Sequence, residues 1–183
     1  MSRFKKKIIT LQITTIGLIS LSTTSSCNNE SVDSDKKIES KILSPCKNGF
    51  AGIYPCDGYD LLAHLPLSTL NATEGNDSWG WTDTTTKKEY ALMATDANVV
   101  FVDISDASNP IYLGNLPTAT ENSSWRDVKV YNNHAFIVSE ALAHGMQIFD
   151  LTRLRNVTNP PKTFDADTHF TGFGSAHNIV INE

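Results

Sequence analysis

The chain has 183 residues, of which 40% are hydrophobic and 19% are charged, and its formal net charge is −5. This composition is too apolar for an intrinsically disordered chain, and its apolar runs are too few for a polytopic membrane protein. The acidic balance argues against a nucleic-acid-binding protein, because such proteins gather basic side chains against phosphates. The length allows one ordinary domain, or a smaller domain with extensions.

Residues 1–26 predict a signal peptide. A basic n-region at residues 3–7 precedes an apolar h-region at residues 8–21, which is too short to span a bilayer of about 30 Å. Small residues then lead to Cys27, and this ending resembles the lipobox of a bacterial lipoprotein, with Cys27 as the lipidated residue. Thr24 stands where such signals most often have Leu. The alternative is an ordinary secretory signal with a chance cysteine nearby.

Residues 27–44 predict a tether that follows the lipidated cysteine. They are rich in Asn, Ser, Asp and Lys and poor in aromatic residues, which is typical of a flexible linker. Several acyl chains on one cysteine would hold the chain stably on a membrane. We therefore expect an exported protein, lipid-anchored at the outer membrane or the cell surface. The sequence does not choose between a periplasmic and an outward-facing leaflet.

Two further cysteines, Cys46 and Cys56, predict a disulfide. An even pair in an exported chain is typical of a disulfide, and a metal site would need more ligands at short spacing than stand beside them. Closing this ten-residue loop is worth on the order of 2–3 kcal/mol in the chain-entropy model.

An internal repeat begins at residue 78. Ser78-Trp79 recurs as Ser124-Trp125, the alanine at 91 aligns with that at 135, and Asp103 aligns with Asp150. Each unit has four short, β-branched segments in about 46 residues, the period of a β-propeller blade. We expect an all-β propeller with blades of four antiparallel strands at about 78–123 and 124–174, and a third blade from 175. A β-sandwich ranks lower, because it gives no reason for a fixed period.

Local signals place turns within these blades. Asn132-Asn133 predicts a two-residue hairpin, because Asn tolerates positive φ. Pro110 follows a turn cluster and begins the next strand. Asp103 and Asp150 each end an apolar strand, and their recurrence predicts that they accept hydrogen bonds from the turn that follows.

These segments resemble a known family. The sequence VVFVDISDASNPIYLG, from residue 99, resembles the LVIVD repeat of bacterial propeller proteins. Residues 46–70 resemble the leading motif of the choice-of-anchor B family, exported proteins of Bacteroidetes type with variable membrane anchoring, and residues 45–77 form that leading segment here. The resemblance covers about residues 46–183. It implies an exported propeller of unassigned biochemical role, and it assigns no catalytic residue.

The predicted blade count is small for a closed ring. Propellers close with several blades, which bury the blade faces and protect the sheet edges. Residues 78–183 supply two blades and the first strand of a third. We therefore expect an N-terminal fragment of a longer protein, and the alternative is a short natural form that completes a ring by oligomerising.

Polar residues at the start of the inner strands are the first candidates for a site. With Trp79-Gly80-Trp81, Trp125-Arg126-Asp127 and Ala176-His177-Asn178 as equivalent positions, Arg126, Asp127 and His177 would meet near the axis. Such a group suits a metal, a carboxylate or a sugar. The competing interpretation, which we favour, is that these side chains satisfy buried backbone groups. The three tryptophans suit either a sugar platform or packing between blades.

A second candidate group lies in the loops of the second blade. Glu140 and His144 have a carboxylate–histidine spacing, and His169 lies eight residues before His177 with acidic residues nearby. A divalent metal such as calcium is the cofactor that these side chains would suit, although no known metal or nucleophile motif is present. Our expectation is therefore no resident cofactor and no catalytic residue.

Two functions from different classes remain. The first is a non-enzymatic, lipid-anchored propeller that binds a protein or a glycan at the cell envelope and does not bind nucleic acid. The second is a metal-dependent envelope hydrolase that uses the His/Asp/Glu group. A purely structural envelope protein is a third possibility.

Overall fold

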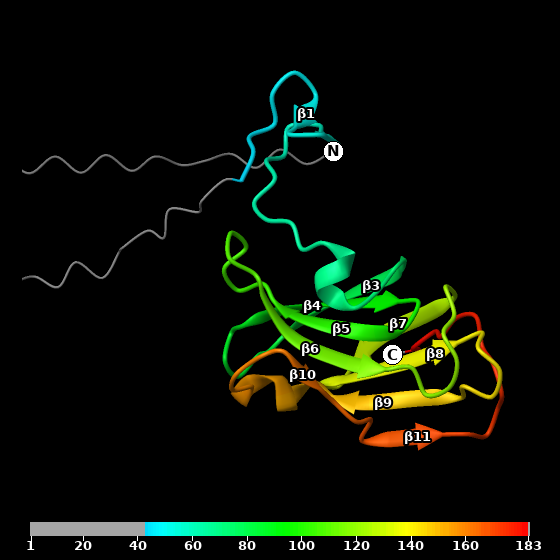
Figure 1. The fold of residues 1–183 in the computed structure, drawn as a ribbon. Helices are drawn as coiled ribbons and strands as arrows, with labels where there is room; N and C mark the ends of the chain where they lie inside the picture. The colour runs from blue at the N-terminus through cyan, green and yellow to red at the C-terminus, as the bar shows by residue number, and fades with distance from the viewer. Residues whose placement is uncertain (1–42, 183) are drawn as a thin grey trace, which may run out of the picture. The chain divides into compact units, whose positions relative to one another are not determined.

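The structure is a computed structural model that describes residues 43–182 (Figure 1). The chain divides into two units, Met1–Lys37 and Ile38–Glu183, and the described residues belong to the second. The predicted signal peptide, Cys27 and most of the predicted tether lie outside the described residues. Within the described part, no helix is long and apolar enough to cross a membrane.

The fold is all-β, as predicted, and its first large sheet has five strands. Four of them form an antiparallel meander, and the fifth, β10 (Lys162–Thr163), adds to its outer edge. The meander consists of β3 (Gly75–Thr82), β4 (Glu89–Thr95), β5 (Asn98–Asp103) and β6 (Ile111–Pro117). All six residues of β5 are buried, which suits a β-branched and aromatic run in the middle of a sheet.

The second large sheet repeats this plan with four antiparallel strands. It consists of β7 (Arg126–Tyr131), β8 (His134–Ser139), β9 (Met146–Asp150) and β11 (Thr168–Phe170). The predicted hairpin at Asn132-Asn133 is confirmed: both residues have positive φ, and Tyr131 pairs with His134. Two four-stranded antiparallel units in succession are compatible with part of an LVIVD-type propeller.

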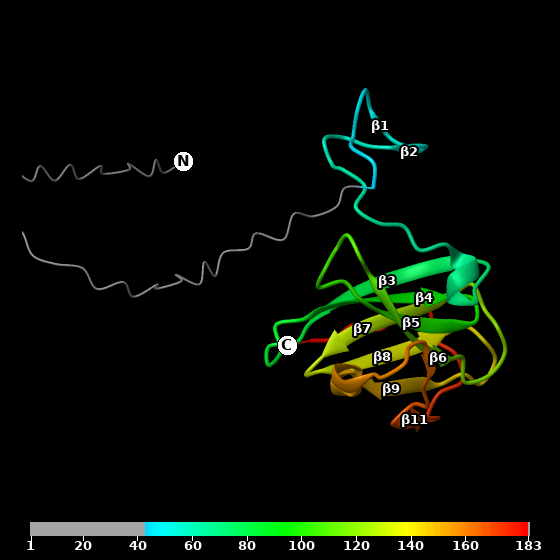
Figure 2. The ribbon, with the colours of Figure 1, turned by 60° about the vertical axis from the view of Figure 1, so that its left-hand side comes forward.

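The segment between β9 and β11 connects the two sheets (Figure 2). It forms the 3-10 helix η2 (Leu151–Asn156) and then β10, which pairs in parallel with β6 before the chain returns to β11. Gly114 allows this close approach, because its φ is +143° and an added Cβ would lie 2.0 Å from the carbonyl oxygen of Lys162. We did not predict this crossing from the sequence.

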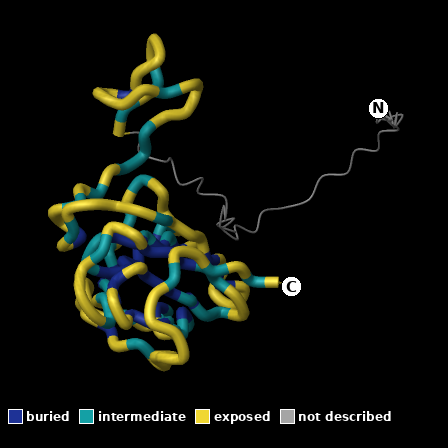
Figure 3. Tube along the Cα trace, turned by 90° about the vertical axis from the view of Figure 1, so that its right-hand side faces the viewer, coloured by how far each residue is buried: buried dark blue, intermediate teal, exposed yellow. Residues whose placement is uncertain are grey.

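An aromatic core holds the two sheets together. Phe101 of β5 stacks on Phe149 of β9 with ring centroids 4.6 Å apart, and Phe164, just after β10, meets both rings edge-on. Trp81 is buried and stacks on Tyr90, so it fills the space between the sheets. Figure 3 shows buried segments running through the middle of this region. The apolar faces of both sheets are thereby removed from water.

Polar contacts fix the ends of the strands around this core. Ser105 donates its backbone N–H to Asp103, and Thr152 donates its backbone N–H to Asp150, so the predicted role of these recurring aspartates is confirmed. Arg155 of η2 binds Asp83 through two bonds of 2.7 and 2.8 Å. The Arg155 guanidinium lowers the pKa of Asp83, and this pair joins the second sheet to the end of β3.

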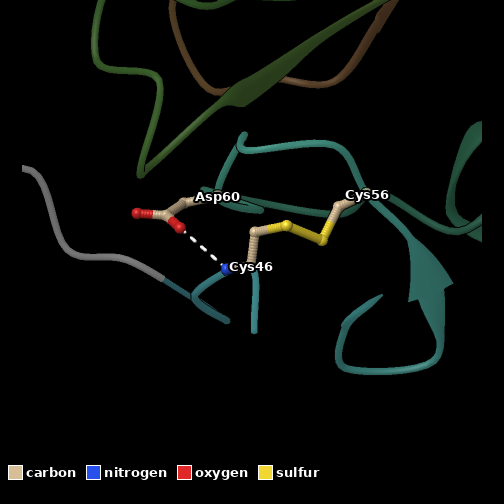
Figure 4. The surroundings of a disulfide bond; sticks show 3 residues. All are labelled: Cys46, Cys56 and Asp60. Atoms are coloured by element: carbon tan, nitrogen blue, oxygen red, sulfur yellow. Dashed lines mark hydrogen bonds between the residues drawn. A yellow bond between two sulfur atoms is a disulfide. The ribbon is translucent and has the colours of Figure 1, made fainter. Parts of the chain in front are cut away.

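The leading part of the described chain holds the predicted disulfide. Cys46 and Cys56 are bonded, with their Cα atoms 6.0 Å apart, so this prediction is confirmed (Figure 4). Between them lies a two-stranded sheet of β1 (Phe50–Ala51) and β2 (Tyr54–Pro55). A 3-10 helix, η1 (Leu67–Leu70), follows before β3.

We predict that Phe149→Ala destabilises the fold by about 3–5 kcal/mol, because it removes a fully buried ring from the aromatic core. Chemical denaturation followed by fluorescence measures this change. Phe170→Ala is the matched control, because that ring is 51% exposed, and it should cost about 1 kcal/mol or less. Equal losses in the two variants would contradict this account of the core.

Candidate functional site

The candidate site lies where the first strands of the two sheets meet the C-terminal segment of the described chain. A pocket of about 280 Å³ opens there, and polar side chains supply most of its wall. Its residues come from β3, from the start of β7 and from the segment after β11: Asn76, Asp77, Trp125, Arg126, Asp127, Lys129, His177 and Asn178. We call this the inner-strand pocket. It brings the predicted Arg126, Asp127 and His177 together.

Strand register defines which positions are equivalent. Ala91 pairs with Gly80 in the first sheet, and its counterpart Ala135 pairs with Val130 in the second, so Gly80 corresponds to Val130. Counting back along both strands, Asp77 corresponds to Asp127. The sequence alignment of Trp79-Gly80-Trp81 with Trp125-Arg126-Asp127 is therefore wrong. The connection from Thr82 to Glu89 in the first sheet is longer than the turn from Tyr131 to His134 in the second, and matching the Ser-Trp pairs could not reveal that difference.

The segment after β11, which occupies the position of a third inner strand, shows the same pattern of hydrogen bonds. Asp77 Oδ2 accepts the Val128 N–H at 3.0 Å, and Asp127 Oδ2 accepts the Ile179 N–H at 2.7 Å. Asn178 thus takes the place of Asp127 in the third copy, which agrees with the predicted pairing of Arg126 with His177. Each carboxylate satisfies a backbone donor on the next inner segment, so these acids have a structural task.

Lys129 connects the two carboxylates. Its ammonium group lies 3.2 Å from Asp77 Oδ2 and also pairs with Asp127, while it sits over the ring of Trp79 at 4.8 Å from the centroid. Burial raises the pKa of Asp77, but hydrogen bonding with Asp127, Val128 and Lys129 outweighs that effect and lowers it to about 2. Both acids are therefore engaged within the protein and are poorly placed to act as free metal ligands.

Arg126 and His144 form a buried pair behind the pocket. Arg126 Nε donates to the carbonyl oxygen of Thr95 at 3.1 Å, and its Nη1 lies 3.0 Å from His144 Nε2. His144 Nδ1 faces the carbonyl oxygen of Gly145 at 3.0 Å, so Nδ1 carries the proton and Nε2 accepts from Arg126. Burial lowers the pKa of His144, with a further contribution from Arg126, and keeps the ring neutral.

The charge of Arg126 is also affected by its surroundings. Its side chain is only 2% exposed, and burial lowers its pKa to about 10, an effect that Asp96 partly offsets. The guanidinium therefore stays charged at neutral pH. Its two bonds to Thr95 and His144 show that its main partners are within the protein.

The other predicted histidines are placed separately. His169 Nε2 donates to the carbonyl oxygen of His144 at 2.6 Å. His177 Nδ1 lies 2.5 Å from Glu140 Oε1, so Glu140 pairs with His177 and not with His144. His177 also stacks obliquely on Trp125, with ring centroids 5.4 Å apart. His177 is thus the one predicted histidine that reaches the inner-strand pocket.

Residues 43–182 hold no group of three or more His, Cys, Asp or Glu side chains that could bind one metal ion. The histidine nitrogens described above already face partners within the protein. The metal-dependent hydrolase therefore gains no support from the described residues, and it stays a prediction from the sequence.

Sequence reasoning missed several residues of the pocket. Asn76 accepts the Arg126 N–H at 3.0 Å, and Lys129 and Asn178 complete the wall. The spacing of 50 or 51 residues between Asp77, Asp127 and Asn178 was the available signal, but it becomes visible only when strand pairing sets the alignment. Trp125 also lines the pocket and is 55% exposed, so much of its surface is free for a ligand.

Comparison with known proteins agrees with this architecture. Residues 85–118, which contain β4, β5 and β6, match the family model of the LVIVD repeat. The predicted LVIVD-type repeat is therefore confirmed for this part of the chain. No curated protein and no solved structure gave a significant match.

We predict that Asp77→Asn lowers thermal stability at neutral pH and has little effect near pH 2. The folded pKa of Asp77 lies below its ordinary value, so its contribution is present above about pH 4 and is lost as the pH falls toward 2. Melting temperatures measured across this range test the sign. Asp106→Asn is the control, because that carboxylate accepts from Ser108 in an exposed turn. A difference that stays constant with pH would contradict the prediction.

Proposed function

We propose that this protein is an exported, lipid-anchored β-propeller module that binds a glycan at the cell envelope through the inner-strand pocket. A protein ligand is the other partner that such a module would take. The resemblance of residues 46–70 to the choice-of-anchor B family and the predicted lipidation of Cys27 support the envelope location. The confirmed LVIVD repeat supports the propeller module.

One observation carries the glycan proposal: an exposed aromatic ring borders a small polar pocket. Trp125 presents an aromatic face, and Asn178 and His177 offer donors and acceptors within the same wall. Sugars have apolar ring faces and many hydroxyl groups, so they use both kinds of surface. The volume lies near the lower end of the range of about 300–1,000 Å³ for ligand sites, which suits a single sugar unit.

The charge pattern also favours a neutral ligand. Asp77 and Asp127 accept backbone N–H groups and share Lys129, and Arg126 supplies the second positive charge, so positive and negative groups are matched across the pocket. An anionic ligand would have to compete with these carboxylates for Lys129, whereas hydroxyl groups can add to the existing bonds.

We predict that Trp125→Ala weakens glycan binding about tenfold, equivalent to about 1.4 kcal/mol, because the stacking face is lost. Calorimetry of the full chain with oligosaccharides released from bacterial envelopes provides the measurement. Tyr131→Ala is the control, since Tyr131 is similarly exposed at the far end of β7 but does not line the pocket. No saccharide binding by the unmodified chain, or equal losses in both variants, would overturn the proposal.

The lipid anchor has its own test. We predict that Cys27→Ser abolishes incorporation of a labelled fatty acid and moves the protein from the membrane fraction to the soluble fraction. The thiol of Cys27 is the proposed attachment point, so no other residue should replace it. Cys46→Ser serves as the control and should keep the label. A Cys27→Ser variant that remains labelled would disprove this lipidation site.

A further inference from the structure

The disulfide-closed segment carries a cluster of exposed apolar side chains. We call residues 46–60 the knob. Ile53 is 84% exposed, Tyr59 is 83% exposed, and Phe50 and Tyr54 are 54% and 40% exposed. Single exposed apolar residues are normal, but several neighbouring ones mark a surface that binds a partner or a membrane.

The knob holds these side chains in place. β1 pairs with β2, so Ala51 faces Tyr54, and Gly52 with a φ of +65° makes the tight turn that puts Ile53 at the tip. The disulfide closes the base, and Asp60 accepts the Cys46 N–H at 2.8 Å (Figure 4). A rigid presentation lowers the entropy cost of binding.

Part of the backbone of the knob is paired within the knob. Lys47 and Phe50 exchange two backbone hydrogen bonds of 2.9 and 3.0 Å, and the Cys56 N–H reaches the carbonyl oxygen of Gly49. Moving such a hairpin into the lipid interface therefore carries fewer unpaired backbone groups into a water-poor layer than an unpaired loop would. Transfer of the apolar tip out of water lowers the free energy, and the paired backbone groups reduce the cost of that transfer.

We propose that the knob inserts Ile53 and Phe50 into the interfacial layer of an uncharged lipid surface. Tyr54 and Tyr59 are the other exposed aromatic residues of the knob, and tyrosine favours the boundary between lipid and water because its ring is apolar and its hydroxyl is polar. Asp57 and Asp60 disfavour anionic lipids, and only Lys47 of the knob opposes them. The surface is therefore a neutral one.

The chain that precedes the knob favours a membrane over a protein partner, because it leads back to a proposed lipid anchor. This step rests on the proposed lipidation of Cys27, which lies 19 residues before Cys46. At about 3.3–3.6 Å per residue, the knob reaches at most about 60–70 Å from the acylated residue. A lipid anchor thus keeps the knob at a high effective concentration near the bilayer, where a weak second contact becomes useful.

The test uses the full chain carrying Cys27→Ser, so that lipidation plays no part. We expect Ile53→Asp to reduce co-sedimentation with phosphatidylcholine vesicles about tenfold. Val180→Asp is the matched control, because Val180 is 88% exposed but lies outside the knob, and it should leave binding unchanged. Residues 1–42 are identical in both variants, so the difference reports the exposed position alone.

A local readout checks the insertion itself. Ile53→Trp should gain quenching by brominated lipids, and Val180→Trp should not. Equal co-sedimentation of the two aspartate variants, or no added quenching at position 53, would overturn the proposal. So would an Ile53→Asp variant that changes self-association in size-exclusion chromatography while keeping vesicle binding, because that result assigns the knob to a protein contact.

The outcomes separate this proposal from the lipid anchor. Failure of fatty-acid labelling at Cys27, together with loss of vesicle binding in Ile53→Asp, would keep the knob and reject the anchor. Labelling at Cys27 with no effect of Ile53→Asp would keep the anchor and reject the knob.

Discussion

The apolar faces of the sheets must be covered, and the rest of the structure depends on how this is done. β5 is buried along its whole length, so both faces of the first sheet need cover at this strand. The second sheet provides it on one face through the contact of Phe101 with Phe149, and Phe164 completes the cluster. The chain reaches Phe164 only because it leaves the second sheet after β9 and adds β10 beside β6. Connectivity and packing therefore depend on the same cluster.

Packing of the two sheets also brings their first strands side by side. The backbone N–H groups near the inner-strand pocket then require hydrogen-bond acceptors. Backbone N–H groups on β7 and on the segment after β11 face the preceding inner strand. Asp77 and Asp127 accept these N–H groups, and Lys129 pairs with both carboxylates. The residues that looked most like a ligand set are thus partly committed to holding neighbouring segments together. Trp125 and His177 keep more of their surface exposed.

The sequence predicted the fold class, the hairpin at Asn132-Asn133, the disulfide and the turn bonds of Asp103 and Asp150. These features depend on residues close in the chain or on a short repeat. The inner-strand alignment was wrong because the connection from Thr82 to Glu89 is longer than the turn from Tyr131 to His134, and the spacing of the Ser-Trp pairs does not show that difference. Similarly, the burial of His144 against Arg126 and the pairing of Glu140 with His177 depend on packing between distant segments. Residue spacing alone could not decide between these partners.

The repeat separates positions that stay constant from positions that vary. Asp77 and Asp127 keep one task, which is to accept a backbone N–H from the next inner segment. The residue just before each of these positions differs: Asn76, Arg126 and His177 precede Asp77, Asp127 and Asn178. These three side chains meet different partners, since Asn76 accepts from backbone, Arg126 binds Thr95 and His144, and His177 binds Glu140. Because the aspartate positions hold the sheets together, the residue just before each of them can differ and change the chemistry of the pocket. Arg126 is buried, whereas the side chain of His177 is exposed and can contact a ligand beside Trp125.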